Sequence, residues 1–140
     1  MVSFWPTRRP KRRVSRVVLD SSAVLALLRG ETGADRVESA RTHALISTVN
    51  VCEVLTRQYE LGWDQGSAQA AFEALELDVS AFPMSDAVSA AALRAATRHA
   101  DLSLGDRACL VLALRESAPV MTADRDWLKV DVGVEVLLIR

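Results

Sequence analysis

Four acidic residues stand where strands and helices are expected to meet: Asp20, Glu53, Asp106 and Asp124. Asp20 and Asp124 each close a short apolar run, whereas Glu53 and Asp106 each lie in the first turns of a segment with a helical pattern. In a parallel α/β sheet, the end of each strand and the start of the next helix lie on the same edge. Chain geometry therefore predicts four carboxylates at one edge of a sheet.

The segment from Leu102 to Trp127 makes this prediction most specific. From Asp106 to Ser117 a helix spans about 17 Å at 1.5 Å per residue, and from Pro119 to Asp124 an extended chain returns about 17 Å at 3.3 Å per residue. Asp106 and Asp124 are thus expected to lie level with each other.

Carboxylates brought together in this way need a positive partner. Two of them about 5 Å apart repel by about 3 kcal/mol at an effective dielectric constant near 20. No lysine lies close to any of the four acids in the sequence. Oxygen ligands without cysteine or clustered histidine favour Mg²⁺ or Mn²⁺ over zinc. One or two such ions would suit hydrolysis of a phosphodiester, because they lower the pKa of the attacking water and stabilise the entering and leaving oxygens.

Each acid also has an ordinary structural explanation, and these stay open at this stage. The alternatives are capping of a helix by Asp20, pairing of Glu53 with Arg57, a capping box of Ser103 with Asp106, and a turn or helix cap at Asp124. Arg107 and Arg125 adjoin the acids and could hold a phosphate or form plain salt bridges.

The hydrophobic periodicity predicts strands that alternate with helices. Strands are expected at 16–19, 43–47, 79–82, 119–122 and 134–139, and helices at 21–28, 32–41, 49–61, 64–77, 85–99 and 103–117. Thr32 with Asp35 looks like a capping box for the second helix. This order predicts an α/β fold with a mostly parallel central sheet flanked by helices, in one domain spanning residues 16–140.

The charge is unevenly distributed along the 140 residues. Although the net charge is −1, six of the 17 basic residues precede Asp20, and the other 11 basic and 18 acidic residues leave about −7. Residues 1–15 hold two prolines and most of this basic cluster, and they are expected to form a disordered arm. Such an arm could tether RNA or be an artefact of expression or start-site choice.

The remaining composition indicates the compartment. The two cysteines, Cys52 and Cys109, have no metal-binding or CxxC spacing, which favours buried free thiols in a reducing compartment. No apolar run is long enough for a signal peptide or a membrane span. We expect a cytoplasmic protein that does not enter a membrane.

Several segments together resemble PIN-domain ribonucleases, specifically the VapC-type toxins of bacterial toxin–antitoxin pairs. They are Val18–Ala23, the Thr48 to Glu53 helix, Leu102–Ala108 and Val120–Trp127. The resemblance implies a three-layer PIN fold, dependence on one or two Mg²⁺ or Mn²⁺ ions, and endonucleolytic cleavage of RNA by metal-activated water. It also implies inhibition by a cognate VapB-like antitoxin, and a homodimer.

The resemblance further implies roles for individual residues. Asp20, Glu53, Asp106 and Asp124 would bind the metal or support its ligands, and Asp126 matches a position that is acidic in some relatives. Ser21 and Thr122 would orient ligands or water.

Other classes fit less well. A receiver-like regulatory domain needs an acid pair after the first strand, and a haloacid-dehalogenase-like phosphatase needs Asp-x-Asp there, but Ser21 and Ser22 follow Asp20. A non-catalytic module that binds RNA or a protein partner remains the alternative.

Overall fold

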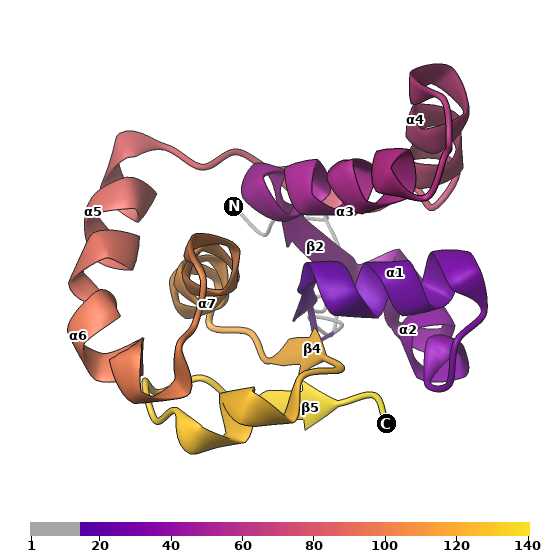
Figure 1. Cartoon of the computed structure of the whole chain (residues 1–140). Helices are drawn as coiled ribbons and strands as arrows, with labels where there is room; N and C mark the ends of the chain where they lie inside the picture. Colours follow the sequence, from indigo (N-terminus) through magenta and orange to yellow (C-terminus); the bar gives the residue numbers. More distant parts are fainter. Residues whose placement is uncertain (1–14) are drawn as a thin grey trace, which may run out of the picture.

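The computed structural model describes residues 15–140, which form a five-stranded sheet with helices on both faces (Figure 1). The strands are β1 (Val17–Leu19), β2 (Ala44–Ser47), β3 (Asp78–Ser80), β4 (Val120–Thr122) and β5 (Val136–Leu138). The α-helices are α1 (Ser21–Arg29), α2 (Ala34–Ala40), α3 (Thr48–Glu60), α4 (Gln65–Glu73), α5 (Met84–Ala92), α6 (Arg94–Thr97) and α7 (Leu104–Glu116). Short 3₁₀ turns are η1 (Arg41–His43), η2 (Arg98–Ala100) and η3 (Arg125–Lys129).

The strand order is β3-β2-β1-β4-β5, and every neighbouring pair is parallel. Val18 of the central strand lies opposite Leu45 on one side and Val120 on the other. Because all five strands run the same way, their carboxyl ends share one edge. The predicted α/β fold with a parallel sheet is confirmed.

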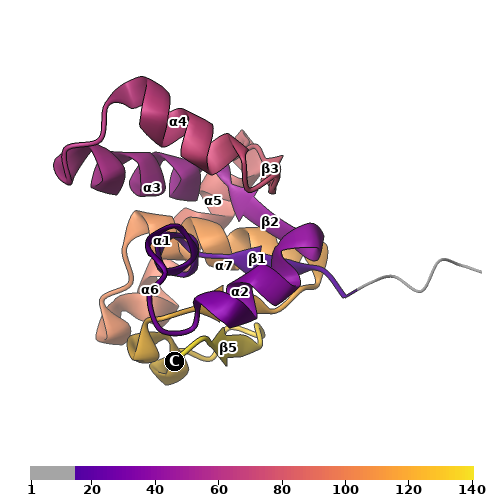
Figure 2. The ribbon, with the colours of Figure 1, turned by 90° about the vertical axis from the view of Figure 1, so that its right-hand side faces the viewer.

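Alternate side chains of the strands enter two separate cores. Val17 and Leu19 pack in the core with α1, α2 and α3, whereas Val18 packs in the core with α7. Figure 2 shows α1 and α2 in front of the strands and α7 behind them. The fold therefore has three layers, with the sheet in the middle.

The helix α7 is buried on nearly all sides. Six consecutive residues, Ala108 to Ala113, are buried, because the sheet covers one side of α7 and α5 packs on another. Figure 1 shows α5 and α6 wrapping around the outside of α7. This burial explains why the segment is apolar all round, as the sequence indicated.

The predicted capping box of Thr32 with Asp35 is wrong. The helix α2 begins at Ala34 after Gly33, and no side chain caps it. Gly33 has φ of 96°, and a Cβ there would lie 2.9 Å from Cγ1 of Ile139. The approach of the last residues of the chain thus fixes the start of α2, which a local pattern could not reveal.

The single helix predicted over 85–99 is also wrong. The chain instead forms α5, bends at Leu93, and continues as α6 and η2. Arg107 on α7 donates from Nη1 to the carbonyl of Ala90 at 2.8 Å, and Arg94 reaches the carbonyl of Leu102 at 3.4 Å. These bonds hold the bent segment around α7. Helix α4 likewise ends at Glu73 rather than near 77, and Glu76 adopts a left-handed conformation with φ of 52°.

The predicted arm of residues 1–15 lies outside the described residues, except for Ser15. Within residues 15–140, no helix has the length and apolar character needed to cross a membrane.

Candidate active site at the carboxyl edge of the sheet

Asp20 lies at the centre of this edge, between the end of β1 and the start of α1. Its Oδ1 accepts hydrogen bonds from the backbone amide of Ala23 at 2.9 Å and from the hydroxyl of Ser22 at 2.7 Å, and its Oδ2 accepts one from Thr122 at 2.6 Å. The residue is only 3% exposed. Burial raises the pKa of the Asp20 carboxyl to about 6, although all three hydrogen bonds oppose the shift.

Two hydroxyls connect Asp20 to the end of β4. The oxygen of Thr122 accepts the amide of Asp124 at 3.0 Å, and the oxygen of Ser22 accepts the amide of Ala123 at 2.9 Å. Thr122, to which the resemblance gave the role of orienting ligands or water, thus connects Asp20 with Asp124. Ser22 was missed, and the only local signal for it was its place two residues after Asp20. Ser21, to which the resemblance gave the role of orienting ligands or water, lies beside Glu53, and its hydrogen bond lowers the pKa of that carboxyl.

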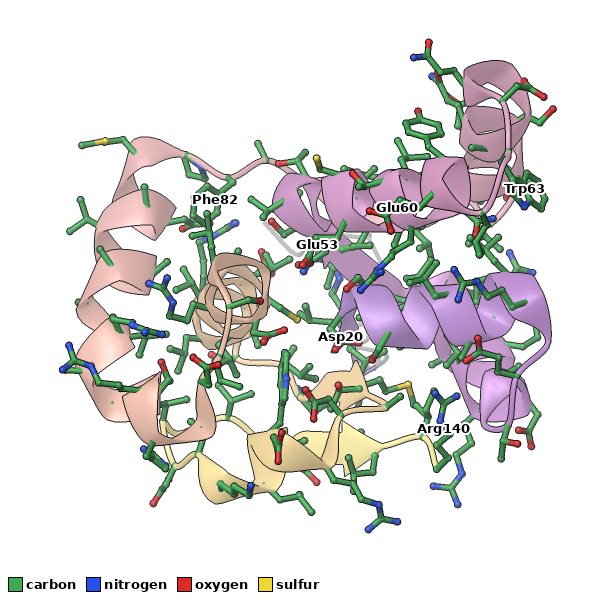
Figure 3. The ribbon with its side chains drawn as sticks, viewed as in Figure 1. Asp20, Glu53, Glu60, Trp63, Phe82 and Arg140 are labelled. Atoms are coloured by element: carbon green, nitrogen blue, oxygen red, sulfur yellow. The ribbon has the colours of Figure 1, made fainter. Side chains whose placement is uncertain are left out.

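Glu53 reaches the site from the second turn of α3. Its Oε1 accepts a hydrogen bond of 2.8 Å from Asn50, whose side chain also donates to the carbonyl of Gly105 at 3.0 Å. Burial raises the pKa of Glu53, and the charge of Asp106 adds to the shift. Figure 3 shows the side chains of Glu53 and Asp20 on the same side of the molecule, between α3, α1 and α7.

Asp106 interacts through its charge with each of the other three acids. It forms a capping box at the start of α7, in which Oδ2 accepts the amide of Ser103 at 3.0 Å and its own amide donates to the Ser103 hydroxyl at 3.2 Å. Burial raises the pKa of Asp106, and the charge of Asp124 raises it further. The charge of Asp106 in turn raises the pKa of both Asp20 and Glu53. The charges of the four acids therefore act on one another, and we call them one electrostatic group.

Asp124 and Asp126 lie at the exposed rim. The Oδ1 of Asp124 accepts the amide of Asp126 at 2.9 Å and caps η3. Asp126 pairs with Lys129 at 2.8 Å. The premise that no lysine lies near the acids concerned the four acids and did not include Asp126. Lys129 is five residues beyond Asp124, and the turn of η3 brings it back toward both aspartates.

Three of the four ordinary explanations for the acids are correct. Asp20, Asp106 and Asp124 each cap a helix, whereas Arg57 pairs with Glu60 at 3.1 Å instead of with Glu53. Helices that follow parallel strands begin at the same edge, so acids that cap them also converge. The position of these acids at helix starts thus explains both why they cap helices and why they lie near one another.

Arg107 and Arg125 follow Asp106 and Asp124 in the sequence, but neither arginine forms a salt bridge with an acid in the described residues. Arg107 turns away toward Ala90 on α5.

The residues present fit a divalent cation by their chemistry. In the hydrogen bonds of the described chain, Asp106 Oδ1 and Asp124 Oδ2 accept nothing, so each keeps an oxygen for a ligand. The raised pKa values of three carboxyls show that burial and mutual repulsion oppose their charges, which a cation would relieve. Within residues 15–140 no three Asp, Glu, His or Cys side chains are already arranged around one point to hold a metal. Side chains would have to turn toward the ion.

A pocket of about 410 Å³ adjoins these acids between α1 and α3. Its wall contains Ser21, Ser22, Leu25, Cys52, Glu53, Thr56 and Arg57. Cys52 is exposed there, in contrast to the buried thiol expected from the sequence, whereas Cys109 is buried below the acids. Of the four acids, Glu53 lines this pocket, and its carboxylate is open to solvent on this side.

Solved structures show the same fold. The chain is similar to VapBC of Salmonella typhimurium bound to DNA (TM-score 0.70, 16% identity, 90% of this chain and 99% of that chain covered). It is also similar to VapBC2 of Rickettsia felis bound to a promoter DNA fragment (TM-score 0.67, 15% identity, coverage 87% and 97%). VapBC-5 of Mycobacterium tuberculosis is a third such structure (TM-score 0.61, 19% identity, coverage 90% and 98%).

A comparison with curated protein sequences finds no match. The family model for the PIN domain, however, matches residues 17–133, a span that begins at β1 and contains Asp20, Glu53, Asp106 and Asp124. The parallel sheet, the acids at its carboxyl edge and this match agree, and the chain belongs to the PIN-domain family.

Proposed function

We propose that this protein is a divalent-metal-dependent endoribonuclease of the VapC type, which cleaves RNA phosphodiester bonds and is neutralised by a VapB-like antitoxin. The observation that carries the proposal is the electrostatic group of Asp20, Glu53, Asp106 and Asp124. These acids come from four segments, and the charge of Asp106 acts on Asp20 and Glu53 while Asp124 acts on Asp106.

In this proposal each acid has a distinct task. Asp106 and Asp124 offer their unengaged oxygens to Mg²⁺ or Mn²⁺, and Asp20 supports them from below, where Ser22 and Thr122 fix its carboxylate. Glu53 completes the site from α3. The bound ion would polarise a water and stabilise charge on the phosphate oxygens. The acids also oppose the approach of RNA to the metal-free site, because both are negatively charged.

The toxin assignment rests on the relatives. The similar solved structures include a toxin–antitoxin complex from Klebsiella pneumoniae, with 19% identity, in addition to the VapBC structures above. We propose that this chain likewise binds an antitoxin over the acidic edge, forms a homodimer and works in the cytoplasm. Asp126, paired with Lys129 at the rim, is proposed to adjust the charge beside the ion rather than to bind it.

The test is cleavage of RNA by the purified chain without antitoxin. Total bacterial RNA is incubated with the protein in Mg²⁺ or Mn²⁺, and new 5′ ends are mapped. Discrete cuts are expected, and EDTA or the substitution Asp106→Asn should abolish them. Asp35→Asn is the matched control, because Asp35 is an exposed aspartate in the first turn of α2, outside the group of four acids, and the same substitution there should leave the metal-dependent step intact.

The alternative is a PIN-fold module that binds RNA or a protein partner without cleaving. It is favoured by one observation, namely that the described residues contain no ready-formed metal cluster. If the protein neither cuts RNA nor binds Mn²⁺ in calorimetry, this alternative replaces the nuclease proposal. If it binds Mn²⁺ but total RNA is not cut, the substrate was absent from the mixture.

A further inference from the structure

Asn50 is a fully buried polar residue that faces the contact between α3 and α7. Its side-chain nitrogen donates to Glu53 Oε1 at 2.8 Å and to the carbonyl of Gly105 at 3.0 Å. Both partners are acceptors, so the NH₂ group must point toward them and the amide orientation is fixed. Its Oδ1 is buried without a hydrogen-bond partner in the described chain. The structure thus uses Asn50 for its donors and leaves its acceptor unpaired, although an unpaired buried acceptor is costly.

Gly105 makes room for the same contact. A Cβ built at position 105 would overlap the carboxylate of Glu53, so that carboxylate lies directly against the backbone of the first turn of α7. Asn50, Glu53 and Gly105 together form a contact that we call the α3–α7 clasp. Asp106 follows Gly105 at once, and the clasp therefore sets where Glu53 lies relative to Asp106.

The position of the Glu53 carboxylate over Gly105 needs a stabilising interaction. Partial burial removes some of the hydration of the Glu53 carboxylate, and that carboxylate lies against Gly105, whose next residue is the negatively charged Asp106. Because Glu53 is only half-buried, rotation of its side chain toward bulk water would relieve both effects. The bond from Asn50 opposes that rotation, since it is available only when the carboxylate lies over Gly105.

We propose that Asn50 is a positioning residue, which holds the Glu53 carboxylate beside Asp106 so that both can face one divalent cation. The inference rests on the proposed function, and it adds a residue that acts on the cation only through Glu53. Partners that orient metal ligands in this way commonly change metal affinity by about 10- to 100-fold when they are removed.

A double-mutant cycle tests this role directly. The dissociation constant for Mn²⁺ is measured by calorimetry for the full chain, Asn50→Leu, Glu53→Gln and the double variant. Asn50→Leu is expected to weaken binding by about 10-fold or more. The double variant should bind no more weakly than Glu53→Gln alone, because Asn50 then has no carboxylate to hold. Unchanged binding in Asn50→Leu, or losses that multiply, would overturn the proposal.

Gln58 supplies a matched control. It lies in the same helix, is 1% exposed, and likewise has a buried oxygen without a partner in the described residues. Gln58→Met is expected to change the melting temperature by an amount similar to Asn50→Leu while leaving Mn²⁺ affinity within about twofold. An equal loss of affinity in both variants would mean that burial of polar groups in α3, and not the clasp, affects the ion.

Two further readouts keep the proposal testable. If Asn50→Leu does not fold, Asn50→Thr and Asn50→Val are compared, since they have the same shape and only threonine keeps a donor. Tighter Mn²⁺ binding by the threonine variant supports the proposal, and equal binding overturns it. A ¹³C NMR shift of the Glu53 carboxyl in the metal-free chain should change in Asn50→Leu but not in Gln58→Met.

The outcomes also separate this inference from the proposed function. A full chain that binds no Mn²⁺ contradicts the metal-dependent function and this proposal together. A full chain that binds Mn²⁺ and an Asn50→Leu variant that binds it equally well contradict only the role of Asn50.

Discussion

At the scale of single residues, the burial that lets Asp20 cap α1 also opposes its charge. The residue must be buried to cap α1 and to meet Thr122, but burial raises the pKa of its carboxyl to about 6. The folded chain therefore holds a proton on Asp20 at a pH where the unfolded chain has already lost it. The local arrangement favours the neutral acid, and a nearby cation would favour the charged one.

This conflict predicts a pH dependence of stability. The folded pKa of Asp20 is raised, so its contribution to stability is present below about pH 4 and is lost as the pH rises through about 6. Asp20→Asn should remove this loss, which is about 3 kcal/mol at 1.36 kcal/mol per pKa unit. Because the amide nitrogen cannot accept the hydroxyl of Thr122, the net stabilisation of the metal-free chain at pH 7.5 is expected to be about 1–2 kcal/mol. The free energy of unfolding in urea with EDTA, measured from pH 4.5 to 7.5, checks this.

Asp64 is the control for the sign of this effect. It also caps a helix, but it is exposed, and hydrogen bonds from Ser67 lower the pKa of its carboxyl. Asp64→Asn should therefore destabilise the chain at pH 7.5 and have less effect as the pH falls. If both variants shift stability in the same direction, burial is not what distinguishes the two aspartates.

At the scale of elements, the first turn of α7 requires a glycine, because a side chain there would overlap Glu53. Gly105 is the second residue of α7, and Gly66 holds the same place in α4. A Cβ at Gly66 would make only an ordinary contact of 3.4 Å with Asp64 Oδ1, whereas a Cβ at Gly105 would overlap Glu53. Two glycines in equivalent helix positions thus have different reasons to be there.

The pair gives a matched prediction. Gly66→Ala should stabilise the chain by about 0.5–1 kcal/mol, as expected for glycine to alanine within a helix. Gly105→Ala should lose that gain and weaken Mn²⁺ binding by about 10-fold, because it pushes Glu53 away from Asp106. Thermal unfolding and calorimetry of both variants test it, and equal stabilisation with unchanged Mn²⁺ binding in both would contradict the role given to Gly105.

Local features of these elements could be predicted from the sequence, whereas contacts between distant segments could not. The place of each acid at a strand end or in the first turns of a helix could be predicted because these are local features. That Asp106 and Asp124 lie level with each other stays a prediction from helix and strand rise. Ser22 and Asn50 could not be recognised, since their partners Ala123 and Gly105 are far away in the sequence. The bend after α5 could not be predicted for a related reason. The alanine-rich segment contains no glycine or proline to end the helix, and the hydrogen bonds that hold the bend join it to other segments.

At the scale of the whole molecule, the described body begins its contacts at Arg16. This residue pairs with Asp78, and it lies 3.7 Å from Glu116. The family model begins one residue later, at residue 17.

Deleting residues 1–15 should leave the melting temperature within about 2 °C, as expected for a change in stability well below 1 kcal/mol. Metal-dependent cleavage of RNA should also be nearly unchanged. Calorimetric melting and the cleavage assay measure the two effects. A large loss of cleavage with unchanged melting would instead support a tethering role for the basic segment.

The spread of the acids along the chain has a consequence during synthesis. Asp20 follows the first strand and Asp124 follows the fourth, so the site is complete only after most of the protein has left the ribosome. On the proposed function, a nascent or truncated chain that ends before Asp124 is harmless to the RNA around it. The cell would then have until the last part of translation to bring an inhibitor to the newly made chain.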